Sequence, residues 1–363
     1  MQLISPEKVI RGKNAWAIAK KEIIKISNSP LLLGRSNATE YLRLKLYEDL
    51  IEEDLKPISA NLKYDCCIED LDRIYKIAKE NNCDSIIAAG GGKVLDSGKL
   101  LAEYLSIPVI TVPLSSSTCA GWTALANIYS KEGQFVKDVS LKSCPKILVF
   151  DHKLIKTAPK RTLASGIADS LAKWYESSLT SSNNNDGLIQ QALQIARVIR
   201  DQLFIDGEKA FKNPTENIAA WSNVIEGNSL TAGLIGGIGG ERCRTAAAHA
   251  LHNAITQLKP TNMPLHGEIV GVGILLQLKL EEALNNNKLA NQTSKQLEIF
   301  MKDLELPTTI LELGIDIFSN DNLHRIAQFA CREESEIHYL PFKIGLSEIK
   351  EVISDFEKQK IKT

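Results

Sequence analysis

Short apolar runs in the first 150 residues alternate with segments of helical periodicity. Four runs have the length and content of buried strands, namely 31–33, 85–89, 108–112 and 147–150. Helical periodicity appears between them over 70–80 and 93–104. Strands that alternate with helices predict a parallel sheet whose faces are covered by helices.

The pattern changes near Pro159, after which almost every segment has helical periodicity. Six helices are predicted, over 162–179, 186–203, 214–232, 245–256, 267–284 and 293–304. Polar breaks between them, such as 181–186, are typical of solvated loops. We therefore expect an α/β domain over 1–158 plus an all-α domain over 159–363.

Composition limits the classes of function. Of 363 residues, 44% are apolar and 24% charged, and 43 basic against 44 acidic residues leave a net charge of -1. This balance argues against a nucleic-acid or anionic-membrane partner. The N-terminus lacks the features of a signal peptide, and the longest apolar stretch, 269–278, is too short to cross a bilayer. Seven cysteines without a CxxC motif suggest reduced thiols, so a cytoplasmic location is expected.

A glycine turn, Gly90-Gly91-Gly92-Lys93, follows a predicted strand and opens a predicted helix. Glycines there allow an anion to approach the backbone, and a helix N-terminus offers free N–H groups to a phosphate. Neither the Walker A spacing nor GxGxxG fits, the latter because residue 95 is leucine. A tight turn without a ligand is the alternative, but Asp96 and Lys99 on one helical face favour a ligand. The second glycine-rich run, 233–240, follows no strand and is predicted to be a flexible turn, with a phosphate role less favoured.

Three of the six histidines fall within 18 positions. His249 and His252 are three residues apart and face the same side of a predicted helix, and His266 follows 17 residues after His249. A single histidine there would be better explained as a hydrogen-bonded core residue, whereas three together favour a metal site. A carboxylate would complete an open catalytic set. Asp169, near the start of an otherwise apolar helix, is one candidate, but spacing alone does not select it over other acids or over a helix-start role.

Six segments carry a family resemblance, in the family's order and at similar separations. They are GGGKVLDSGK at 90–99, PVITVPLSSST at 108–118, GIADSLAKWYE at 166–176, AAAHALHN at 246–253, LHGE at 265–268 and IHYLP at 337–341. The chain resembles the iron-containing alcohol dehydrogenase superfamily, in its glycerol-dehydrogenase-like branch, over nearly its whole length. The resemblance implies a dehydroquinate-synthase-like fold, an NAD or NADP cofactor and one divalent metal, zinc or iron. A small-molecule substrate and a homo-oligomer are also expected.

The resemblance also assigns roles to individual residues. The family's metal ligands correspond to Asp169, His249 and His266, and His252 becomes a candidate proton relay. The positions that would bind the cofactor are Gly91, Gly92, Lys93, Val94, Leu95, Asp96, Ser117, Thr123, Leu125 and Tyr129.

Two departures from the glycerol dehydrogenases concern the substrate. Cys119 stands where those enzymes carry an aspartate that contacts the substrate hydroxyls, and a thiol cannot replace a carboxylate in that role. Arg244 stands where they have a small residue, and arginine is a natural bidentate partner of a carboxylate. Both features resemble the hydroxycarboxylate dehydrogenase subgroup and predict a 2-oxo acid substrate, unless Arg244 merely pairs with Glu241. Glycerol or another polyol is the alternative, and a dehydroquinate-synthase-type lyase or a catalytically silent nucleotide-binding protein is less favoured.

The residue after the first predicted strand concerns the dinucleotide. NAD-selective members carry an aspartate there, which accepts from the ribose 2′-hydroxyl. Here the strand ends Leu33-Gly34-Arg35-Ser36. Loss of the acid and gain of Arg35 favour a 2′-phosphate and hence NADP(H), although a solvated loop arginine would give the same sequence.

Overall fold

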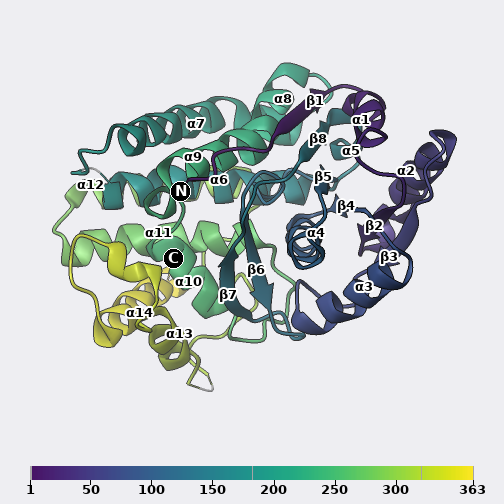
Figure 1. The fold of residues 1–363 in the computed structure, drawn as a ribbon. Helices are drawn as coiled ribbons and strands as arrows, with labels where there is room; N and C mark the ends of the chain where they lie inside the picture. Colours follow the sequence, from purple (N-terminus) through teal and green to yellow (C-terminus); the bar gives the residue numbers. More distant parts are fainter. Residues whose placement is uncertain (1, 182, 320, 363) are drawn as a thin grey trace. The chain divides into compact units, whose positions relative to one another are not determined.

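A computed structural model describes residues 2–181, 183–319 and 321–362 (Figure 1). The chain forms two compact units, Met1–Pro159 and Lys160–Thr363. The division falls one residue from the boundary expected from the change in periodicity.

The first unit contains a six-stranded, fully parallel sheet with strand order β1-β8-β5-β4-β2-β3. The expected parallel sheet is therefore confirmed. Its strands are β1 (Lys8–Gly12), β2 (Pro30–Gly34), β3 (Ile58–Asn61), β4 (Ser85–Gly90), β5 (Val109–Pro113) and β8 (Ile147–Asp151).

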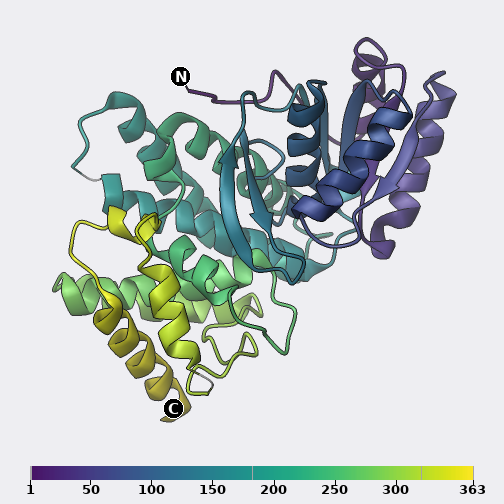
Figure 2. The same ribbon diagram turned by 60° about the horizontal axis from the view of Figure 1, so that its bottom comes forward.

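Helices cover both faces of this sheet. On β4, Ile87 and Ala89 pack with α1 (Ala15–Ile23) and α2 (Glu40–Glu52) in one apolar core. Side chains alternate between faces along a strand, so Ile86 and Ala88 face the other side, where α4 (Gly92–Leu105) lies against them. A Cβ atom at Gly98 of α4 would lie only 2.4 Å from the Cβ of Ala88. Next to α4 lies α3 (Ile68–Glu80), and Figure 2 shows this unit from a second direction.

Some of the elements that the sequence analysis did not predict have weak local signals. β1 and β3 are edge strands whose residues are mostly exposed or half-buried, so they lack the apolar runs of the central strands. A separate antiparallel hairpin, β6 (Leu125–Tyr129) and β7 (Phe135–Ser140), follows β5. One short helix, α5 (His152–Ile155), follows β8.

In the second unit, all regular elements of the described residues are helical. The α-helices are α6 (Lys160–Ser181), α7 (Gly187–Lys212), α8 (Ile218–Glu226), α9 (Ala232–Gly239), α10 (Ala247–Ile255), α11 (His266–Leu284), α12 (Lys288–Asp303), α13 (Asn322–Ala330) and α14 (Leu346–Lys362). Helix α11 is buried along most of its length and contacts α6, α10, α12 and α14. None of the helices in the described part of the chain is both long and apolar enough to cross a membrane.

Three local predictions for this unit differ from the structure. The glycine-rich run 233–240 is not a flexible turn, because residues up to Gly239 belong to α9. Its glycines allow close packing: a Cβ at Gly239 would lie 2.3 Å from the Cys243 sulfur. The helix predicted over 214–232 begins later, at Ile218, and continues beyond 232, because a π-helical turn, Gly227–Thr231, joins α8 to α9 without a break. Asp169 also lies nine residues inside α6 rather than at its start.

Candidate metal centre

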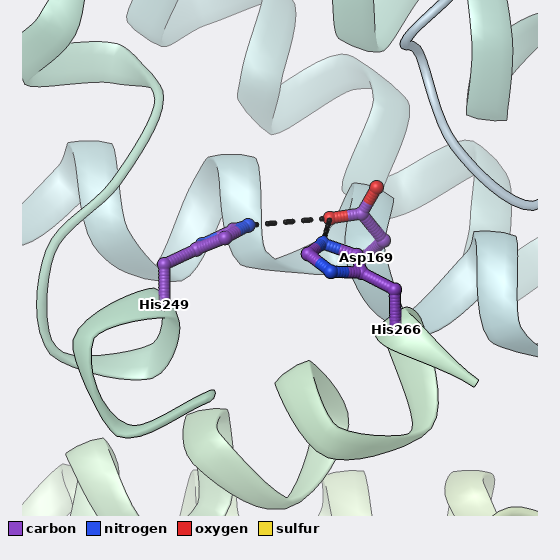
Figure 3. A group of neighbouring side chains, drawn as sticks. All are labelled: Asp169, His249 and His266. Atoms are coloured by element: carbon purple, nitrogen blue, oxygen red, sulfur yellow. Dashed lines mark ion pairs between the residues drawn. The ribbon is translucent and has the colours of Figure 1, made fainter. Parts of the chain in front are cut away.

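Three side chains from three helices of the second unit converge on one point (Figure 3). The Oδ1 atom of Asp169 on α6 lies 3.4 Å from Nε2 of His249 on α10 and 3.6 Å from Nε2 of His266, the first residue of α11. All three ligand atoms lie within 4.8 Å of one another. Asp169 and His249 are buried, while the His266 side chain is 25% exposed.

This donor set is suited to a divalent metal. Two imidazole nitrogens and one carboxylate oxygen are ligands that zinc and Fe(II) both accept, and a three-residue set leaves coordination positions open. The Nδ1 atom of His249 is already engaged, 2.6 Å from Oε2 of Glu176, so only its Nε2 is available to an ion. Asp169, His249 and His266 therefore fit one metal ion.

Glu176 is the residue that holds His249, and the sequence analysis did not identify it. It lies two helical turns after Asp169 on α6 and is fully buried. Its Oε1 also accepts hydrogen bonds from the backbone N–H groups of Ala246 (2.6 Å) and His249 (3.0 Å). A carboxylate that orients the distal nitrogen of a ligating histidine fixes its tautomer and ring position. The available signal was a second acid on the Asp169 face of an apolar helix.

The N-terminus of α10 is capped by residues from other helices, because its own N-cap residue offers no acceptor. The helix begins after Ala246, which has no side-chain acceptor for the first free N–H groups. Glu176 supplies one acceptor, and Oε1 of Gln277 on α11 supplies another to the N–H of Ala248 at 3.2 Å. Helix α11 comes this close because residue 273 is glycine: a Cβ there would lie 2.4 Å from the Ala248 carbonyl oxygen.

Charges around the cluster keep Asp169 ionised and His249 protonated in the absence of metal. Burial alone would raise the pKa of Asp169, but Lys173, one turn further along α6, and the two histidines hold it well below its usual range. Burial alone would lower the pKa of His249, but the Glu176 charge and the hydrogen bonds to Asp169 and Glu176 together outweigh burial and raise the pKa to about 9. A metal ion bound to the cluster would displace the proton that His249 carries in the metal-free protein.

The two other predicted catalytic residues of this unit lie beside the cluster. The His252 ring packs edge-on against the His266 ring, with centroids 4.2 Å apart. Its Nδ1 contacts the Oδ1 of Asn253 at 2.9 Å, and burial together with His266 lowers its pKa, so it is neutral. The carbonyl of Arg244 accepts a hydrogen bond from Nζ of the buried Lys173 at 3.1 Å.

The Arg244 side chain does not form the ion pair considered for it. Its stem lies against α9, where a Cβ at Gly236 would be 2.9 Å from Cγ of Arg244. Within the described ranges, no carboxylate, including that of Glu241, lies within 4.0 Å of its guanidinium. The pair with Glu241 that the sequence allowed is therefore not formed among the described residues.

In the first unit, the glycine turn directly joins β4 to α4. Strand β4 ends at Gly90, and Gly91 immediately precedes the first residue of the helix. The loop that follows β5 lies against this turn, because a Cβ at Gly92 would be 3.1 Å from Oγ1 of Thr118. Oγ of Ser117 is 3.2 Å from Oγ of Ser115 in the same loop. Gly91, Gly92 and the loop containing Ser117 are therefore brought together at the carboxyl end of the sheet.

Several other predicted cofactor residues connect α4 to the hairpin. Asp96 and Lys99 are buried and form an ion pair of 2.9 Å. The Lys99 ammonium also donates to the carbonyls of Thr123 (3.1 Å) and Leu125, and Asp96 accepts from the Asn127 N–H at 3.2 Å. Val94 and Leu95 are buried, and Cys119 is half-buried.

The remaining predicted cofactor residues surround an acid that the sequence analysis did not identify. Nη2 of Arg35 lies 2.8 Å from Oδ1 of Asp65, and the Lys93 ammonium pairs with Oδ2 of the same carboxylate. Lys93 also lies over the Tyr129 ring, 5.2 Å from its centroid. Arg35, the residue expected to meet a 2′-phosphate, is therefore already paired.

A parallel sheet with a glycine turn, joined to a helical unit with a His₂-Asp cluster, defines the dehydroquinate-synthase-like architecture. Comparison with known proteins agrees. Residues 6–152 match the model of the family described as iron-containing alcohol dehydrogenase. A glycerol dehydrogenase of Escherichia coli O6:H1 is 30% identical, covering 93% of this chain and 91% of its own. The chain belongs to the iron-containing alcohol dehydrogenase family, in its glycerol-dehydrogenase-like branch, and is an oxidoreductase.

Further relatives and one solved structure extend the comparison. An uncharacterized oxidoreductase of Synechocystis sp. is 40% identical over 94% of this chain and 88% of its own. Hydroxycarboxylate dehydrogenase A of E. coli K12 is 32% identical over 76% and 75%, respectively. The crystal structure of a probable glycerol dehydrogenase from Sinorhizobium meliloti covers all of both chains with a TM-score of 0.86 at 26% identity.

Proposed function

We propose that this protein is a metal-dependent, nicotinamide-linked dehydrogenase that interconverts a small alcohol or polyol and its carbonyl compound. The observation that carries the proposal is the convergence of Asp169, His249 and His266 on one point. Membership of the family and the similarity to glycerol dehydrogenases support the substrate class. The glycine turn supports a dinucleotide, because backbone N–H groups at the start of α4 suit its pyrophosphate.

Each residue of the cluster has a separate task. When bound, a divalent metal polarises the oxygen of the substrate, and a nicotinamide exchanges hydride with the substrate carbon. Asp169 supplies a fixed negative charge, and Glu176 keeps the proton of His249 on Nδ1 so that Nε2 stays a ligand. His252 is neutral, and its contact with Asn253 leaves Nε2 as the proton-accepting atom of the ring. We assign it the exchange of the alcohol proton.

A 2-oxo acid is the second candidate substrate, and one structural observation favours it. The Arg244 guanidinium has no carboxylate partner among the described residues, which suits a bidentate contact with a substrate carboxylate. The similarity to hydroxycarboxylate dehydrogenase A supports the same candidate, but over a smaller share of the chain than the glycerol dehydrogenase match. We therefore place the polyol first and the 2-oxo acid second.

Removal of a ligand tests the proposed function. We expect His249→Ala and His266→Ala to lose bound metal and activity together, because two donors cannot hold the ion in competition with water. His324→Ala, a histidine on α13, is the matched control and should retain both. Elemental analysis of the purified variants, with activity assayed after metal is added back, provides the measurement. Full metal content and turnover in either ligand variant would contradict the assignment.

A substrate panel separates the two candidate substrates. Glycerol and dihydroxyacetone represent the polyol class, and 2-oxobutyrate and 2-oxoglutarate represent the acids. For a polyol enzyme, Arg244→Ala should leave KM for glycerol nearly unchanged. For an acid reductase, it should raise KM for 2-oxo acids by about 10- to 100-fold, the value of a lost charged hydrogen bond.

A further inference from the structure

The ion cluster formed by Arg35, Asp65 and Lys93 joins the ends of three neighbouring strands. Arg35 directly follows β2, Asp65 lies between β3 and α3, and Lys93 is the second residue of α4 after β4. The strands are adjacent in the order β4-β2-β3. All three residues therefore lie at the carboxyl edge of the sheet, and Lys93 is also the last residue of the glycine turn.

This place suits the adenosine half of a dinucleotide. Ligands of open α/β sheets bind outside the carboxyl ends of the strands, with the pyrophosphate at the helix N-terminus. In such sites, an acid accepts from the ribose 2′-hydroxyl of NAD, whereas an arginine accommodates the 2′-phosphate of NADP. Arg35 and Asp65 offer one group of each kind at the same location.

The contacts of the Asp65 carboxylate indicate which of these two groups would meet the adenosine ribose. Its side chain is only 9% exposed, and both oxygens are within ion-pair distance of a cation. Oδ1, although 2.8 Å from Nη2 of Arg35, receives no hydrogen bond of acceptable geometry from any described residue. One buried acceptor is therefore left for a ligand hydroxyl, and such an acceptor is costly to leave unsatisfied.

A 2′-phosphate would meet two obstacles at the same cluster. To bind Arg35 it would have to separate that guanidinium from Asp65, leaving part of a nearly buried carboxylate without its cation. It would then lie beside a like charge, which disfavours both ionised groups. A ribose hydroxyl meets neither obstacle, because it is neutral and would donate to Oδ1, which receives no hydrogen bond from the described residues.

We propose that Asp65 is the residue that makes this protein select NAD(H) over NADP(H), by neutralising Arg35 and accepting from a ribose hydroxyl. The inference rests on the proposed nicotinamide-linked function. It reverses the expectation drawn from Arg35 alone, because that expectation assumed an unpaired guanidinium. Asp65 lies 30 residues further along the chain, so the strand-end sequence gives no sign of it.

Fluorescence titration of the metal-loaded protein with NADH and NADPH tests the proposal. We expect the unaltered protein to bind NADH at least about tenfold more tightly, equivalent to about 1.4 kcal/mol. Asp65→Asn should weaken the binding of NADH and strengthen the binding of NADPH, so that the preference for NADH is lost or inverted. The gain in NADPH affinity should disappear in the double variant Asp65→Asn/Arg35→Ala, because it requires the released guanidinium. Glu69→Gln, which alters an exposed acid paired with Lys131, should leave the ratio unchanged.

The outcomes distinguish this inference from the proposed function. A preference of the unaltered protein for NADPH, or an unchanged ratio in Asp65→Asn, overturns the role of Asp65 while the dehydrogenase proposal stands. Failure of both dinucleotides to bind overturns both. If Asp65→Asn does not fold, competition of ADP-ribose and 2′-phospho-ADP-ribose on the unaltered protein gives the decision. Tighter binding of ADP-ribose supports the proposal, and tighter binding of the phosphorylated compound contradicts it.

Discussion

Glu176 connects the metal cluster to the folding of a helix through a single carboxylate. One oxygen holds Nδ1 of His249, and the other accepts two backbone N–H groups at the beginning of α10. The same residue therefore positions a ligand and replaces the missing helix cap. Because these two tasks use different oxygens, they can be separated experimentally.

Glu176→Gln should reduce metal affinity by about 10- to 100-fold, the usual effect of losing a carboxylate that orients a ligating histidine. The amide keeps one acceptor for the helix N–H groups but removes the charge that faces His249. Competition titration against a chelator of known affinity measures the change.

Gln277→Met is the matched control, because Gln277 also caps α10 but does not contact His249. It should lower the free energy of unfolding by about 1 kcal/mol, the typical value of a cap, while metal affinity stays close to that of the unaltered protein. Equal losses of affinity in the two variants would mean that Glu176 acts only through the helix.

The protonation of His249 makes metal binding depend on pH. Its pKa in the metal-free protein is raised to about 9, against the effect of burial, so the imidazole carries a proton at neutral pH. Because binding must release this proton, His249 alone should raise the apparent affinity about tenfold per pH unit, up to pH near 9. Asp169, whose pKa is well below its usual range, should not contribute to the pH dependence of metal affinity in this range. Calorimetry in buffers of different ionisation enthalpy counts the protons released, and a count of zero at neutral pH would contradict the expectation.

At the scale of elements, close contacts between helices at glycine residues bring the metal ligands together. Helix α11 begins at His266, and the next residue, Gly267, touches α6: its N–H donates to Oγ of Ser165 at 3.1 Å. Any Cβ at Gly267 would lie 1.8 Å from the Ser165 carbonyl oxygen. Ser165 is one turn before Asp169, so this contact sets the separation between the two ligands.

Gly267→Ala should therefore lower stability by about 1–3 kcal/mol and weaken metal binding, because α11 must move away from α6. Gly187→Ala is the control: that glycine also lies in the first turn of a helix, and a Cβ there would have no neighbour within 4 Å. Chemical denaturation and metal titration of both variants check the expectation. A Gly267→Ala protein with unaltered metal affinity would show that this contact does not position His266.

At the scale of the whole molecule, the two proposed ligands bind to different units. Asp169, His249 and His266 all belong to Lys160–Thr363, whereas the glycine turn and Asp65 belong to Met1–Pro159. Ligand binding stabilises the part of a protein that holds the ligand.

Hydrogen exchange measured by mass spectrometry should separate the two effects. Metal should protect the backbone amides of α6, α10 and the first turns of α11, and NADH should protect residues 90–95 and the segment around Asp65. The opposite assignment, with metal protecting the glycine turn, would contradict the proposed sites.

Local patterns determined much of this protein from sequence alone. Continuous apolar runs identified the central strands, and 3.6-residue periodicity identified most of the helical half. These signals depend only on neighbouring residues and their burial. The half-exposed edge strands β1 and β3 gave no such run, and the glycine-rich α9 appeared as a turn because its packing against Ala192 of α7 is not a local property.

The tertiary structure decided which polar groups meet. His249 and His266 were visible as a cluster, but the carboxylate that joins them was chosen by family resemblance, and their geometry with Asp169 required α6, α10 and α11 to cross. Glu176 and Asp65 were not identified from the sequence. Each contacts a residue that was identified: Glu176 contacts His249, and Asp65 contacts Arg35. Their partners lie 73 and 30 residues away, respectively. Contacts of this kind depend on how distant segments pack, so periodicity and short motifs carry no record of them.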